Sequence, residues 1–88
     1  MIELANHPPW KERTIEPIYA TIGQNICKER KELGFTQAEL ASEVGLTRAS
    51  IVNIEAGRQR MLIHTLCQIA EALGVGVIHL MMKGGPHA

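Results

Sequence analysis

The stretch from Thr47 to Leu62 combines anion-binding side chains with a near absence of acidic ones. Glu55 is its only carboxylate. Its cationic side chains are those of Arg48, Arg58 and Arg60. Guanidinium groups bind phosphate oxygens, and such contacts supply most of a protein's nonspecific affinity for nucleic acid. The stretch is therefore a candidate for phosphate binding.

The chain as a whole does not share this basic character. Its 88 residues have a formal net charge of zero, which argues against a general affinity for nucleic acid. The acidic residues gather earlier in the chain, at Glu29, Glu32, Glu39 and Glu43. This distribution predicts a local basic face on a neutral body.

Two short helices joined by a glycine turn are predicted to position the basic stretch. Thr36 and Glu39 have the T-x-x-E spacing of a capping box, which marks the start of the first helix. Gly45 lies where a tight interhelical turn needs a positive φ. Thr47 can cap the second helix, which is expected over residues 47–56. Two capped helices around a glycine turn are the layout of a helix-turn-helix.

The rest of the chain is predicted to complete one small, all-α domain over residues 14–82. Residues 1–13 are expected to be a flexible arm, because His7-Pro8-Pro9-Trp10 suits neither a helix nor a strand interior. Residues 83–88 are expected to be a disordered tail. A helix from about residue 14 to Leu33 would place Ile18, Ile22, Ile26 and Leu33 on one face. A helix from about 62 to 73 would bury Leu62, Ile63, Leu66, Ile69, Ala70 and Leu73.

The apolar segment 75–82 is compatible with two structures. Its β-branched residues suit a strand, whereas its apolar cluster suits a short helix, which we prefer. As an apolar segment it is also the best candidate for a dimer interface, either as helix against helix or as a shared strand. The predicted interface residues are Val77, Ile78, Leu80, Met81 and Met82.

From about Ile22 to Met82 the chain resembles the Cro and phage-repressor type helix-turn-helix family, also called the xenobiotic-response-element-like (XRE) family. The resemblance covers most of the chain. It rests on Ile22-Gly23-x-x-Ile26, Arg30-Lys31-x-Leu33-Gly34-Phe35-Thr36-Gln37-x-Glu39-Leu40-Ala41, Gly45-Leu46-Thr47, Ile54-Glu55-x-Gly57 and Ala70-x-Ala72-Leu73-Gly74-Val75. It implies a compact, lambda-repressor-like domain of four or five helices that binds double-stranded DNA.

The resemblance also implies roles for individual residues. Gln37 would bind a backbone phosphate and brace the recognition helix, while Arg48, Ala49 and Asn53 would face base edges. Arginine can form bidentate hydrogen bonds with guanine, and asparagine can form them with adenine. Thr47 and Ser50 would reach phosphate or base, and Arg58 and Arg60 would clamp phosphates. The implied DNA-binding set is Thr36, Gln37, Thr47, Arg48, Ala49, Ser50, Asn53, Arg58 and Arg60. Arg30 and Glu55 would form a structural ion pair.

Other kinds of chemistry find no support in the sequence. The four histidines do not fall at metal-ligand spacing with Cys27 or Cys67, which we expect to be reduced, buried thiols. We see no phosphate-binding glycine loop and no nucleophile elbow, so we expect neither an enzyme nor a cofactor. The N-terminus lacks the pattern of a secretory signal, which predicts a cytoplasmic protein.

Taken together, these features predict a transcriptional regulator, in the first place a repressor, that binds a pseudo-palindromic operator as a homodimer through residues 47–56. Two alternatives stay open. The chain could be an antitoxin that represses its own operon and holds a toxin protein. It could also be a protein-interaction module on the same fold, a possibility that the zero net charge supports.

Overall fold

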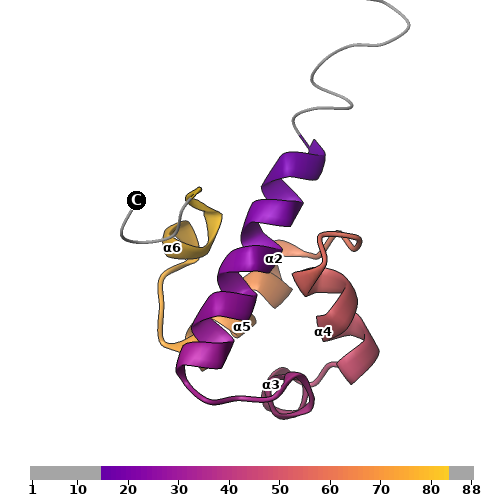
Figure 1. The fold of residues 1–88 in the computed structure, drawn as a ribbon, viewed down its shortest axis with the longest axis vertical. Coiled ribbons are helices and arrows are strands. Elements are labelled where there is room, and N and C mark those ends of the chain that lie inside the picture. Colours follow the sequence, from indigo (N-terminus) through magenta and orange to yellow (C-terminus); the bar gives the residue numbers. More distant parts are fainter. Residues whose placement is uncertain (1–14, 84–88) are drawn as a thin grey trace, which may run out of the picture.

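The computed structural model describes residues 15–83. In this range the chain forms five helices and no strand (Figure 1). The helices are α2 (Ile15–Glu32), α3 (Gln37–Val44), α4 (Arg48–Glu55), α5 (Ile63–Leu73) and α6 (Val77–Met81). The all-α prediction is confirmed, and the segment 75–82 contains a helix. The predicted arm, and all but the first residue of the predicted tail, lie outside the described residues.

Helix α2 is the support on which the other elements are arranged. It packs against α4, α5 and α6, while α3 packs against α4 and α5. In Figure 1, α4 and α6 lie on opposite sides of α2. The second motif helix and the C-terminal helix are therefore separated by α2, and α3 lies below its lower end in this view.

All five described helices contribute to one hydrophobic core. The largest fully buried side chains are Ile26, Leu40, Ile51, Ile54, Ile69 and Leu80. Full burial of such a side chain stabilises a fold by roughly 1.5 to 3 kcal/mol. Because α6 supplies one of them, this short helix is an integral part of the domain.

Several predicted burial states are wrong. Leu80, expected at a dimer interface, is 0% exposed, because it fills the core of its own monomer. Leu62 and Ile63, expected to be buried, are 74% and 76% exposed, because the buried stripe of α5 starts only at Leu66. Leu33 is exposed because it follows the last residue of α2. Cys67 is exposed rather than buried, and Cys27 is partly buried.

A buried asparagine holds α6 in place. The Nδ2 atom of Asn25 donates hydrogen bonds to the carbonyl oxygens of Leu80 and Met82, both at 2.8 Å. Carbonyl groups at a helix C-terminus have no partner within the helix, so a side-chain donor satisfies them. The Nε2 atom of His79 lies 3.0 Å from Oε2 of Glu29. Side chains of α2 therefore fix both the position and the end of α6.

Close contact between α2 and α4 depends on a glycine. A Cβ atom on Gly23 would clash with the carbonyl oxygen of Ile54 and lie 2.7 Å from that of Glu55. The backbone at the end of α4 therefore rests directly on α2. This contact sets the position of the second motif helix.

Candidate nucleic-acid interface

The sequence signals for the two motif helices correspond to real caps. Thr36 Oγ1 accepts a hydrogen bond from the backbone N–H of Glu39 at 3.0 Å, and Glu39 Oε1 accepts one from the Thr36 N–H at 2.8 Å. Gly45 ends α3 with a φ of 70°, and Thr47 Oγ1 caps α4 through the Ser50 N–H at 3.0 Å. The predicted capping box, glycine turn and second cap are all confirmed.

An ion pair joins α2 to the last residue of α4. Arg30 donates to both carboxylate oxygens of Glu55, from Nε at 2.6 Å and from Nη2 at 3.0 Å. Its Nη1 atom donates to the carbonyl oxygen of Phe35 at 2.8 Å. The two side chains are only 9% and 5% exposed. The residues that the resemblance pairs are thus together, and the Glu55 carboxylate is paired and almost fully shielded from solvent.

The pair shifts the protonation of both partners. Burial alone would raise the pKa of the Glu55 carboxyl. The hydrogen bonds from Arg30 and Gln37, together with the Arg30 charge, outweigh burial and hold this pKa below its ordinary value of 4.5. The hydrogen bond to Glu55 raises the pKa of Arg30 despite its burial. Both groups are therefore charged at neutral pH.

Gln37 connects the ion pair to the exposed start of α4. Its Nε2 atom donates to Glu55 Oε1 at 3.1 Å, and its Oε1 atom accepts a long hydrogen bond from Arg48 Nη2 at 3.4 Å. A chain of polar contacts thus runs from Arg30 through Glu55 and Gln37 to Arg48. This geometry fits the bracing role that the resemblance gives to Gln37. As first residue of α3, Gln37 also lies at a helix N-terminus, where backbone N–H groups can bind an anion.

The other predicted contact residues lie at the starts of α3 and α4, in the second half of α4 (Asn53) and in the loop after α4. The exposed ones are Thr36, Thr47, Arg48, Ala49, Arg58 and Arg60. Ser50 and Asn53 are partly exposed. None of them belongs to the hydrophobic core. These side chains can therefore contact a ligand.

A contact that the sequence did not predict joins Asn53 to Arg58. Asn53 Oδ1 accepts hydrogen bonds from Arg58 Nη2 at 3.1 Å and from Nε at 3.4 Å. The two residues are five apart and on either side of the helix end, so helical periodicity gives no signal for the pair. The signal is Gly57, whose positive φ of 75° reverses the chain. The backbone N–H of Arg58 then donates to the Asn53 carbonyl oxygen at 3.0 Å.

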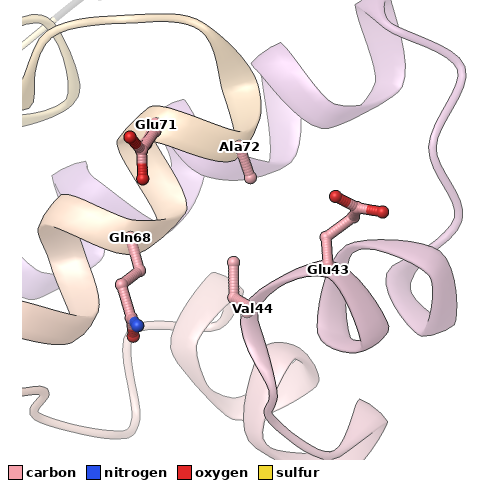
Figure 2. Close-up of a pocket in the computed structure, with 5 residues that line it drawn as sticks. All are labelled: Glu43, Val44, Gln68, Glu71 and Ala72. Atoms are coloured by element: carbon pink, nitrogen blue, oxygen red, sulfur yellow. The ribbon is translucent and has the colours of Figure 1, made fainter.

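A hollow of about 380 Å³ lies elsewhere, between α3 and α5 (Figure 2). Its lining residues are Glu43, Val44, Gln68, Glu71 and Ala72. Figure 2 shows the carboxylates of Glu43 and Glu71 on opposite sides of it. Carboxylates repel phosphate, so this hollow does not belong to the candidate interface.

Residues 15–83 hold no group of three or more histidine, cysteine or acidic residues that could bind a metal ion. None of the described helices is long and apolar enough to cross a membrane.

Two capped helices, a braced second helix and an exposed polar face define a helix-turn-helix DNA-binding domain. Residues 28–80 match the model of the HTH_3 family, described as helix-turn-helix, and the chain belongs to this family. The family is regulatory and binds DNA, so the chain is a transcriptional regulator with a helix-turn-helix DNA-binding fold.

Three relatives illustrate the similarity. An HTH-type transcriptional regulator of Sinorhizobium fredii is 33% identical over 60 residues, which are 68% of this chain and 78% of that protein. The immunity repressor protein of Bacillus phage phi105 is 40% identical over 65% of this chain, but the match spans only 40% of the repressor.

The third relative is SinR, a master regulator for biofilm formation. The crystal structure of SinR in complex with DNA superposes on this chain with a TM-score of 0.66, and the two sequences are 34% identical. The match covers 69% of this chain and 98% of the SinR chain. A SinR–SinI protein complex has a TM-score of 0.68 at 31% identity, covering 76% of this chain and 66% of that chain.

Proposed function

We propose that the protein is a repressor that binds a pseudo-palindromic operator as a homodimer, with α4 as the recognition helix. The observation that carries this proposal is the exposed start of α4, where Arg48 is linked through Gln37 to the buried Arg30–Glu55 pair. A base-reading side chain must be positioned before it meets DNA, and this network positions it. The similarity to a phage immunity repressor and to SinR, solved with DNA, supports the same function.

In this proposal Arg48 reads a base edge, because a guanidinium can fork onto O6 and N7 of guanine in the major groove. Ala49 faces the same groove as a small apolar contact. The starts of α3 and α4, with Thr36, Gln37, Thr47 and Ser50, bind backbone phosphates. Arg60 binds a phosphate from the loop after α4.

The dimer surface that we propose is an apolar face formed by α2, the start of α5 and α6. Its exposed members are Ile18, Ile63, Ile78, Met81 and Met82. Three of them, Ile18, Ile63 and Met81, line a groove of about 130 Å³. The other lining residues are Tyr19, Ile22, Met61 and Leu66. Val77 packs partly against the core and Leu80 is inside it, so these two predicted residues are left out of the surface.

The occupant of this face is, in our proposal, a second copy of the chain. One recognition helix contacts only a few base pairs, and useful affinity and selectivity need two half-sites. Because α6 and α4 lie on opposite sides of α2, a copy bound at the apolar face leaves α4 free (Figure 1).

Selection of bound sequences from a randomised duplex pool tests the proposal. The expected result is an inverted repeat whose half-sites are about 10 base pairs apart, centre to centre. Enrichment of a single asymmetric site would contradict the dimer, and no enrichment would contradict sequence-specific binding.

One observation favours a second candidate function, in which the apolar face holds a different protein. The SinR fold has been solved with the SinI protein, and the exposed isoleucines and methionines here could serve a similar purpose. An antitoxin holding a toxin is one form of this function. A tagged chain that captures a stoichiometric protein in place of a second copy would support it. Salt dependence separates DNA binding from a purely protein-binding module. For a dimer that makes roughly six phosphate contacts, a plot of log affinity for DNA against log salt concentration should have a slope of about −5. A protein-binding module would not bind DNA with this dependence.

A further inference from the structure

The geometry points to Asn53 and Arg58 acting as one base-reading unit that selects guanine. This inference rests on the proposed function and deepens it, because it names the base that the unit would recognise. It also differs from the simplest expectation for an asparagine on a recognition helix, which is a fork onto adenine.

The orientation of the Asn53 amide is fixed by its partner. Nε and Nη2 of Arg58 are both hydrogen-bond donors, and a guanidinium has no acceptor. The Asn53 atom that lies 3.1 and 3.4 Å from them must therefore be the oxygen. The NH₂ group of Asn53 then points away from Arg58, while the backbone hydrogen bond between the two residues keeps them together.

The consequence is a change in what the side chain can read. A free asparagine offers one acceptor and one donor, which match N6 and N7 of adenine. With Oδ1 occupied by Arg58, the pair offers only donors. Guanine is the base that presents two adjacent acceptors, N7 and O6, in the major groove, whereas adenine would direct its N6 donor at the donors of the pair.

Arg58 is exposed, so it can be replaced without touching the core. In Arg58→Met the side-chain length is kept and the donors are lost, which frees Asn53 Oδ1. The matched control is Arg60→Met, which removes the same charge from the same loop. Asn53→Ala identifies the base position that the unit reads, because the base preference at that position alone should disappear in this variant.

The experiment is selection from a randomised duplex pool with each variant, followed by titration of duplexes carrying guanine or adenine at that position. The wild type is expected to enrich guanine there and to prefer it by on the order of tenfold. Arg58→Met is expected to shift the enrichment to adenine, while Arg60→Met keeps guanine.

Enrichment of adenine by the wild type would overturn the inference. So would an Arg58→Met variant that keeps the base preference and binds all duplexes more weakly, since Arg58 would then contact only phosphate. In both cases selective binding persists and the proposed function stands. If the wild type enriched no sequence at all, the proposed function would be overturned, and this inference with it.

Discussion

The guanidinium of Arg30 contacts both carboxylate oxygens of Glu55, at 2.6 and 3.0 Å, and so ties the end of α4 to α2. Glu55 in turn accepts from Gln37, which accepts from Arg48. A side chain that faces DNA in our proposal is therefore held by a pair that lies almost entirely inside the molecule. The stability of the domain and the position of Arg48 depend on the same contact.

Glu55→Ala should lower the free energy of unfolding by roughly 3 to 5 kcal/mol, because it leaves the Arg30 charge buried and unpaired. Urea denaturation followed by circular dichroism measures this change. Glu43→Ala, which removes an exposed carboxylate from α3, is the matched control and should change stability by less than about 0.5 kcal/mol. Equal stability of the two variants would show that the ion pair contributes little.

The same pair predicts a dependence of stability on acid. The pKa of Glu55 is lowered in the folded chain, so the unfolded state binds a proton more readily than the folded one. The contribution of the carboxylate is therefore complete above its ordinary pKa of 4.5 and is lost as the pH falls below that value. The difference in unfolding free energy between the wild type and Glu55→Gln should shrink from pH 7 to pH 3. A difference that stays constant over this range would rule out a lowered pKa.

Gly23→Ala should destabilise the fold by about 2 kcal/mol or more, because the added methyl group meets the backbone of α4 at Ile54 and Glu55. Backbone atoms at a helix end cannot move aside as a flexible side chain would. Gly76→Ala is the control, since a methyl group there would meet no atom within 4 Å beyond those of its immediate chain neighbours. Thermal unfolding that shifts equally in both variants would contradict the close contact.

Local signals predicted the elements and the motif. Caps and turns depend on residues adjacent in sequence, so Thr36, Glu39, Gly45 and Thr47 could be assigned from residue type and spacing alone. The Arg30–Glu55 pair came from the family resemblance. No local rule places two residues 25 apart in contact.

Burial and long-range polar contacts were harder to predict. Leu62 and Leu80 have the same residue type, yet one is 74% exposed and the other fully buried. The difference depends on which elements pack around each, and hydrophobic periodicity does not contain that information. Asn25 received no role for the same reason: its partners lie more than 50 residues away, on α6.

Arg48 and Arg60 should affect DNA binding in different ways. Arg48→Ala is expected to reduce discrimination between a cognate and a scrambled duplex by roughly 1 to 3 kcal/mol, because a base contact is lost. Arg60→Ala should weaken binding to both duplexes alike and reduce the slope of log affinity against log salt by about 1. Fluorescence anisotropy titrations at several salt concentrations measure both quantities. The reverse ranking would exchange the two roles.

A single charge on the apolar face should separate the proposed dimer. Ile63 is 76% exposed and borders the groove between α2, α5 and α6, so Ile63→Asp adds a carboxylate to the interface without entering the core. The expected result is a monomer by size-exclusion chromatography with light scattering, with unchanged helix content by circular dichroism. Gln68→Asp, at an exposed position of α5 that lines the hollow facing α3, serves as the control and should stay dimeric. Leu80→Asp would give no such information, because Leu80 is buried in the monomer and a charge there would unfold the domain.

A dimer that persists in Ile63→Asp would place the contact on another surface. Weakened operator binding by a folded, monomeric Ile63→Asp would show that two half-sites must be occupied together.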